Sequence, residues 1–117
     1  MKSAILCLVS IAILVSVTAA EDGFVRVFNS GAFVAVIDVS YEENGETKNV
    51  SSKNYGVGAT EEITIPDGAT NIVVTSKEYV FFGQTLDIFK REYSAPPREC
   101  YKIWGTNLSP QHAKIEC

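Results

Sequence analysis

The segment IWGTNLSP, residues 103–110, predicts the end of a β-strand followed by a tight turn. Gly, Asn, Ser and Pro are turn residues, and a buried Leu would normally lie within the strand. Here Leu108 lies near the tip of the turn, beside the only Trp of the chain. This arrangement predicts a surface that presents an apolar side chain to an apolar partner. We expect Trp104, in the strand before the turn, to be buried in the core.

The cysteines on either side of this segment predict a disulfide. If strands 99–104 and 111–117 pair around Leu108 and Ser109, the numbers of facing residues sum to 217, and Cys100 faces Cys117. In an oxidising compartment this pair is expected to bridge, with at most about 3 kcal/mol of stabilisation. The alternative is two free thiols, or thiols that pair between molecules. Two cysteines and one histidine are too few for a zinc site, so we expect no metal.

Strand patterns fill the rest of the chain up to this hairpin. The Asn44-Gly45 pair is a strong hairpin signal, and Pro66-Asp67-Gly68 is a second turn signal. Between residues 85 and 93 the alternation predicts that Leu86 and Ile88 face inward, with Phe89 on the other face. The predicted strands span residues 24–28, 32–41, 47–52, 61–65, 71–82, 85–93, 99–104 and 111–117.

These patterns recur about every ten residues without a helical period. They predict an all-β fold, an Ig-like β-sandwich of about eight antiparallel strands that ends in the disulfide-bonded hairpin. In such a sandwich the bends can gather at one end. Neither a repeat nor a domain boundary is evident in residues 21–117, so we expect a single domain there.

Residues 1–20 have the pattern of a secretory signal peptide. Lys2 gives a positive start, an apolar run follows from Ala4 to Val17, and small residues precede Glu21. The alternative is an uncleaved membrane anchor. Cleavage would remove Cys7 and give a secreted, extracellular chain of 97 residues with nine basic and fourteen acidic side chains. This acidic balance argues against nucleic acid as a partner and against electrostatic attraction to anionic lipid.

Catalytic patterns are weak in this sequence. His112 is the only histidine and lies in a terminal strand, where we expect it to face solvent, without an evident nucleophile. The acidic pairs Glu42-Glu43 and Glu61-Glu62 lie in or beside turns, where carboxylates favour solubility. We therefore expect a non-enzymatic protein without a cofactor.

Apolar residues at bends are a stronger pattern. Phe81 and Phe82 precede a Gly bend, and Ala32 and Ala59 each follow a glycine at a strand start. One possibility is that both Phe side chains point into the core. The alternative is that at least one is exposed, because adjacent strand residues face opposite sides. Exposed apolar loops gathered at one end would mark a membrane or partner site.

Two glycosylation sequons occur, at Asn49-Val50-Ser51 and Asn107-Leu108-Ser109. The first is ordinary for a secreted loop or edge strand. A glycan on Asn107 would hold the Leu108 turn away from a bilayer. Because Pro110 follows directly, we expect the second sequon to be unused.

Three segments in order resemble the C-terminal membrane-binding domain (domain 4) of the cholesterol-dependent, or thiol-activated, cytolysins, over most of residues 24–111. NSGAFVA at residues 29–35 is similar to the family's His-Ser-Gly-Ala-Tyr-Val-Ala. Residues 65–72 resemble its Ile-Pro…Ala-Arg-Asn-Ile, and residues 103–110 resemble its Trp-Gly-Thr-Thr-Leu-Tyr-Pro. The resemblance implies a β-sandwich whose bottom loops touch the membrane.

The resemblance assigns roles to positions in this chain. It puts Ala32 and Ala59 on two membrane loops and Leu108 on the leucine of the family's cholesterol-reading Thr-Leu pair, in which Asn107 replaces the threonine. Residues 78–84 correspond to the family's Trp-rich loop, but this run is shorter than the family's loop. Tyr79 replaces the family's cysteine, and Phe replaces Trp as the bulky apolar residue. The resemblance thus implies the fold more firmly than the lipid. The family's pore-forming domains are absent from these 97 residues.

Two functions fit these patterns. The first is a secreted, toxin-like or defence-related module that docks on membrane lipid, with sterol as one candidate, and that needs a separate pore-forming partner to perforate a membrane. The second is a soluble module that uses the same loops to bind a cell-surface glycan or protein. A scaffold without a ligand is a weaker third alternative. The candidate contacts are Asn107, Leu108, Phe81, Phe82, Ala32 and Ala59.

Overall fold

The computed structural model describes residues 21–117, and the predicted signal peptide over residues 1–20 lies outside the described residues. Residues 21–117 form eight strands and no helix, so this part of the chain has no helix that could cross a membrane. The strands are β1 (Gly23–Asn29), β2 (Ala35–Glu43), β3 (Glu46–Ser51), β4 (Thr60–Ile65), β5 (Thr70–Tyr79), β6 (Thr85–Tyr93), β7 (Arg98–Thr106) and β8 (Ser109–Ile115). The predicted eight-stranded sandwich is confirmed.

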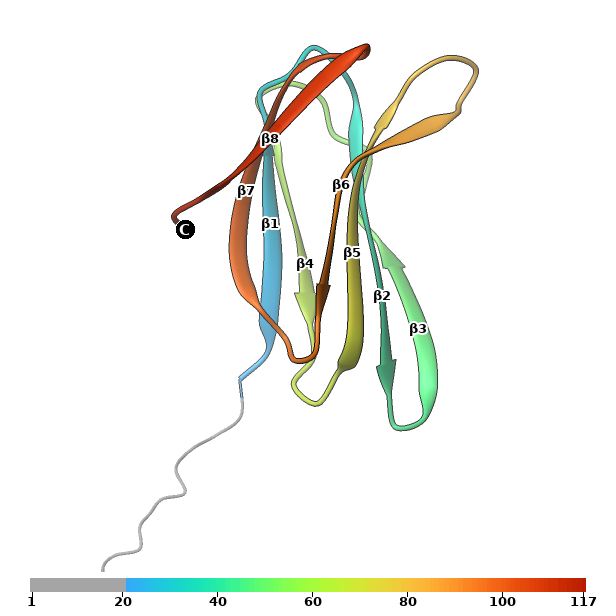
Figure 1. Cartoon of the computed structure of the whole chain (residues 1–117), viewed down its shortest axis with the longest axis vertical. Helices are drawn as coiled ribbons and strands as arrows, with labels where there is room; N and C mark the ends of the chain where they lie inside the picture. Colours follow the sequence, from blue (N-terminus) through green and yellow to red (C-terminus); the bar gives the residue numbers. More distant parts are fainter. Residues whose placement is uncertain (1–20) are drawn as a thin grey trace, which may run out of the picture.

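The strands form two four-stranded sheets that pack as two layers (Figure 1). One sheet has the order β4-β1-β7-β8 and the other has the order β3-β2-β5-β6. Every pair of neighbouring strands is antiparallel except β1 and β7, which run parallel with Phe24 beside Arg98. The all-antiparallel arrangement expected from the sequence therefore has one exception. The chain crosses from β6 in the second sheet to β7 in the first sheet, and β7 then runs in the same direction as β1.

The core lies between the two sheets and follows from the alternation of each strand. In β1, Val25 and Val27 are fully buried and Arg26 between them faces outward. Aromatic rings fill the middle, where the ring centroids of Phe89 and Tyr101 lie 4.7 Å apart. The alternation of buried and outward-facing residues in β1 is the period of two that is typical of a half-buried strand.

Phe89 lies in this core, contrary to the outward orientation predicted for it. The pairing of β5 with β6 shifts at Ser76, where Ser76 faces Phe89 but Lys77 faces Asp87. Ile88 is thus the extra residue of a β-bulge, and a bulge changes the face on which the following residues point. Ile88 packs against the core, as predicted, and Phe89 follows it inward. Leu86, also predicted to face inward, is exposed.

The disulfide between Cys100 and Cys117 is present, with the two Cα atoms 5.4 Å apart. The predicted hairpin register is wrong by two residues, because Cys100 faces Ile115 and Cys117 lies beyond the end of β8. The turn consists of Asn107 and Leu108, between the paired residues Thr106 and Ser109. A shift of two residues keeps every side chain on its face, so Cys117 still reaches the sulfur of Cys100.

Four connections lie at one end of the sandwich, drawn at the top of Figure 1. They are residues 30–34, 52–59, 80–84 and 107–108, and we call them together the loop end. The opposite end carries residues 44–45, 66–69 and 94–97. The gathering of bends expected from the sequence is thus a property of the strand order.

Candidate functional site

The loop end collects most of the large apolar side chains that the described residues expose. Of nine such side chains in residues 21–117, five lie in its four connections. They are Val34, Val57, Phe81, Phe82 and Leu108, whereas Leu86, Trp104, Val50 and Ile115 lie on strands. Soluble monomers rarely gather exposed apolar side chains in this way, so the loop end is the candidate interaction site.

Charged residues are nearly excluded from the same region. Lys53 is the only Lys, Arg, Asp or Glu in the four connections of the loop end. The chain as a whole carries a formal net charge of −4. The acidic residues thus lie elsewhere on the molecule, and the loop end is apolar and almost uncharged.

The β5–β6 connection projects two aromatic rings. Phe81 is 64% exposed and Phe82 is fully exposed, so both Phe side chains are at the surface. The N–H of Gln84 donates to the carbonyl of Phe81 over 3.0 Å, which closes a turn around Phe82 and Gly83. Both central residues have positive φ, 56° for Phe82 and 78° for Gly83. This conformation disfavours a residue as bulky as Phe, so the turn presents the Phe82 ring at a cost in backbone energy.

The β7–β8 turn projects one aliphatic side chain. Leu108 is 88% exposed at its tip, whereas Asn107 is half-buried and its side-chain oxygen has no hydrogen-bond partner within residues 21–117. Gly105 shapes the approach to the turn with a φ of 101°, where a side chain would collide with the backbone of Ser109. Leu108 is therefore the outermost apolar group of this hairpin.

Trp104 is 36% exposed, and the prediction that it enters the core is wrong. It alternates with buried Ile103 in β7 and lies on the outer face of its sheet. The ammonium nitrogen of Lys102 lies 5.8 Å from the centroid of its ring. The only Trp of the chain is thus part of the exposed surface beside the loop end.

A buried asparagine joins two of the loops. Asn29 is fully buried, and its side-chain amide donates to the carbonyls of Phe33 and Tyr55 over 2.8 and 3.2 Å. Its side-chain oxygen accepts from the N–H of Gly31, and its backbone carbonyl accepts from the N–H of Gly58. Sequence reasoning missed this role, although an Asn before Ser-Gly is a sign of side-chain hydrogen bonding in a turn.

The two alanines predicted on the membrane loops differ in exposure. Ala32 is exposed, and its N–H donates to the carbonyl of Gly105 over 3.0 Å, which ties the β1–β2 connection to β7. Ala59 is half-buried and packs against the core. Ala32 can therefore contact a partner, whereas Ala59 mainly supports its loop.

Val57 was not among the predicted contacts, although it is 70% exposed in the β3–β4 connection. It stands between Gly56 and Gly58, so the signal that identified Leu108, an apolar residue among turn residues, was present there too. Val34 is also exposed, directly before β2.

A carboxyl group is buried near the base of the β5–β6 connection. Glu78 is fully buried at the end of β5, and neither of its carboxylate oxygens has a hydrogen-bond partner in the described part of the chain. Burial disfavours the charged form, and the pKa of Glu78 is raised as a result.

The remaining predicted positions lie as follows. Asn49, in the first sequon, is exposed on β3, away from the loop end, and Asn107, in the second, is half-buried in the turn. His112 does not face solvent as expected, because its ring stacks on Phe89 with the centroids 4.9 Å apart. Desolvation and the nearby charge of Arg91 lower the pKa of His112.

Comparisons with known proteins bear on this fold. Residues 24–111 match the family described as the thiol-activated cytolysin beta sandwich domain. No curated protein sequence is significantly similar to the chain.

Solved structures of similar fold include pneumolysin, suilysin and intermedilysin. The membrane-binding domain of pneumolysin is 18% identical with a TM-score of 0.61, over 83% of this chain and 98% of that domain. Suilysin from Streptococcus suis is 23% identical with a TM-score of 0.63, over 84% of this chain and 24% of suilysin. A disulfide-locked mutant of intermedilysin solved with human CD59 is 21% identical with a TM-score of 0.58. The match covers 84% of this chain and 25% of the intermedilysin chain. This chain therefore spans about a quarter of these two toxins.

Proposed function

The chain belongs to the thiol-activated cytolysin β-sandwich domain family, and we propose that it is a secreted, non-enzymatic, toxin-related module that docks on lipid membranes through its loop end. The observation that carries the proposal is the gathering of five exposed apolar side chains in four connections that contain one charged residue. The predicted signal peptide is the reason for proposing that the module is secreted.

The physical basis of docking is transfer of apolar area from water into the lipid. Withdrawing one Phe or Leu side chain from water contributes roughly 1.5–3 kcal/mol. Phe81, Phe82, Val57 and Leu108 are each more than half exposed, so together they can offset the loss of rotational and translational freedom on binding. The acidic chain gains nothing from anionic headgroups, so binding by this route is expected to be insensitive to salt.

The lipid contact is proposed to be apolar first and sterol-specific second. Leu108 projects from the β7–β8 turn, whereas Asn107 is half-buried beside it. Leu108 would therefore enter the hydrocarbon region before Asn107 reaches a sterol hydroxyl. Sterol would strengthen binding without being required for it.

Attachment is the only step we assign to this module. Its eight strands are all engaged in the two sheets of the sandwich, so perforation of a membrane would fall to a separate pore-forming partner.

The test is co-sedimentation with phosphatidylcholine vesicles, with and without cholesterol. Val57→Asp places a charge at the loop end, and Val50→Asp is its matched control, because Val50 is an exposed valine on β3. We expect Val57→Asp to lower the vesicle-binding constant at least tenfold, since about 1.4 kcal/mol changes an equilibrium constant tenfold. We expect Val50→Asp to leave the constant unchanged. A blue shift of Trp104 fluorescence should accompany binding.

The opposite result selects the other function. If the unmodified protein ignores both kinds of vesicle but is retained on a glycan array or by a cell-surface protein, membrane docking is wrong and the loop end serves a soluble recognition module. A glycan found on Asn107 by mass spectrometry would point the same way.

A further inference from the structure

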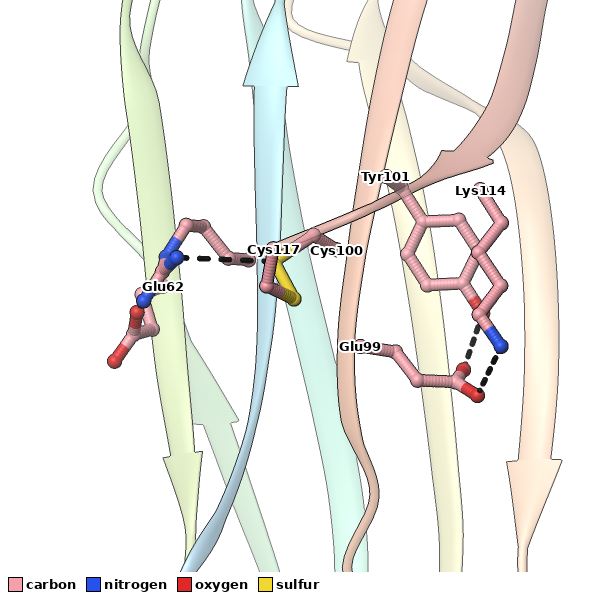
Figure 2. Close-up of a disulfide and its surroundings, with 7 residues drawn as sticks. Glu62, Glu99, Cys100, Tyr101, Lys114 and Cys117 are labelled. Atoms are coloured by element: carbon pink, nitrogen blue, oxygen red, sulfur yellow. Dashed lines mark hydrogen bonds and ion pairs between the residues drawn. A yellow bond between two sulfur atoms is a disulfide. The ribbon is translucent and has the colours of Figure 1, made fainter.

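The disulfide joins one buried cysteine to one exposed cysteine. Cys100 is 3% exposed on the outer face of β7, whereas Cys117 is exposed beyond the end of β8. Figure 2 shows the bridge between Glu62 on one side and Glu99, Tyr101 and Lys114 on the other. The two sulfur atoms therefore belong to residues of very different accessibility.

A permanent positive charge lies beside the buried sulfur. Arg26 is the register partner of Cys100 in the parallel β1–β7 pair, and its Nη1 lies 3.8 Å from the Cys100 sulfur. Its Nε donates to Glu62 over 2.7 Å, and its guanidinium stacks 4.9 Å from the centroid of the Phe24 ring. Neither of these two contacts involves the sulfur atoms of the bridge.

The bridge also borders open space. A hollow of about 180 Å³ is lined by both cysteines together with Arg26, Thr60, Ile115 and Glu116. This volume is large enough for the end of a small molecule beside the sulfur atoms. The charged groups that line it or contact Arg26 are Arg26 itself, Glu116 and Glu62.

We propose that this bridge is a site of thiol–disulfide exchange with a small-molecule thiol, in which Cys117 takes the incoming sulfur and Cys100 leaves. The thiolate of the incoming molecule attacks the sulfur of Cys117 and forms a mixed disulfide there. The bond between the two protein sulfurs breaks, and its electron pair stays on Cys100 as a thiolate beside Arg26. One S–S bond forms and one breaks, so no further oxidant or reductant is needed.

The direction of the exchange follows from access and from the leaving group. Attack requires approach to a sulfur, which favours exposed Cys117, and a thiolate leaves faster when a nearby cation stabilises it. Both factors select the same products. Exchange would also release the clamp on the hairpin that carries Leu108, since residues 107–108 lie inside the loop closed by the bridge.

The test uses reduced glutathione as the probe with the folded, oxidised protein. After short incubation, remaining thiols are alkylated with iodoacetamide and the peptides are mapped by mass spectrometry. We expect glutathione on Cys117 and the alkyl group on Cys100 in the same molecules. An adduct mainly on Cys100, equal adducts on both cysteines, or only disulfide-linked dimers would each overturn the proposal.

Two variants separate the role of Arg26 from general accessibility. Arg26→Met should slow formation of the adduct about threefold to tenfold, because the leaving thiolate loses its cation. Glu62→Gln keeps Arg26 and removes the carboxylate that partly neutralises it, so exchange should be faster than in the unmodified protein. If Arg26→Met does not fold, Glu62→Gln decides alone: an unchanged or lower rate refutes the role of the cation.

Discussion

Asn44 and Phe82 have the same left-handed backbone conformation in turns at opposite ends of the sandwich, with φ values of 53° and 56°. Each precedes a glycine, Gly45 with a φ of 79° and Gly83 with a φ of 78°. Asn tolerates this conformation and Phe does not. The turn far from the loop end thus has the residue suited to folding, whereas the turn at the loop end has a fully exposed aromatic ring.

This relationship predicts a trade between stability and binding at Phe82. Phe82→Asn should raise the free energy of unfolding by about 1 kcal/mol, because it relieves the left-handed strain. The same change should weaken vesicle binding, because it removes an exposed ring. Denaturant unfolding and vesicle co-sedimentation measure the two effects.

The reciprocal change is the control for this prediction. Asn44→Phe should lower the free energy of unfolding by a similar amount and leave vesicle binding unchanged. A Phe82→Asn variant that is less stable than the unmodified protein would contradict the assignment of strain.

A second prediction concerns Asn29, which fixes the β1–β2 and β3–β4 connections. Asn29→Ala should lower the free energy of unfolding by about 2–4 kcal/mol, because it leaves the buried carbonyl of Phe33 and the N–H of Gly31 without their partner. The carbonyl of Tyr55 loses one of its two donors and keeps the N–H of Ala35. Chemical denaturation measures the loss, and Asn54→Ala, at an exposed asparagine of the same connection, is the control with an expected change below about 0.5 kcal/mol.

A third prediction concerns the buried carboxyl of Glu78. Its pKa is raised in the folded protein by desolvation, so the unfolded chain loses its proton first as the pH rises above about 4.5. Ionisation therefore favours unfolding at neutral pH. Glu78→Gln should make the protein more stable at pH 7, and this gain should shrink as the pH is lowered towards 4. A gain that does not depend on pH would contradict burial of an ionisable group.

Glu99 supports the opposite prediction. Burial disfavours its charge, but hydrogen bonds outweigh burial and lower the pKa of Glu99 from its ordinary value of 4.5 to about 2. They come from the hydroxyls of Tyr101 and Tyr93, 2.6 Å each, and from the Lys114 ammonium, 2.9 Å. A depressed carboxyl pKa stabilises the fold above pH 4.5, and this contribution disappears as the pH falls from 4.5 to about 2.

The variant Glu99→Gln tests this contribution. It should lower the free energy of unfolding at pH 7 by up to about 3 kcal/mol and make little difference near pH 2. Urea unfolding across this range measures both, with the exposed Glu92→Gln as the control. Equal losses at pH 7 and pH 2 would show that the carboxylate charge does not matter.

Much of the fold could be predicted from the sequence because its signals are local. Asn44-Gly45 and Pro66-Asp67-Gly68 are turns, as their own residues require. The strand pattern of residues 24–28 identified β1, and the spacing of Cys100 and Cys117 identified the bridge even though the register differed by two residues. A shift of two residues preserves the facing of side chains, which is why the error did not separate the cysteines.

Exposure at the candidate site was only partly predictable. Leu108 at the tip of its turn and the exposed Phe pair are properties of short segments. Val57 was not predicted as a contact, because a single Val in a glycine-rich connection becomes part of an apolar surface only when the other loops lie beside it. The exposure of Trp104 was not predicted either, since the pattern of one strand does not say which of its two faces the second sheet covers.

The sequence by itself determined the strands, the turns and the pairing of the cysteines, because each depends on backbone preferences and spacing within a few residues. The tertiary structure alone decided that the bulge at Ile88 turns Phe89 inward, that Trp104 faces outward, and that Asn29 joins separate loops. These outcomes depend on contacts between residues far apart in the chain, where packing of one sheet on the other selects the buried face. The apolar loop end is a product of that packing, since the packing of the two sheets brings four connections of the chain to one end of the sandwich.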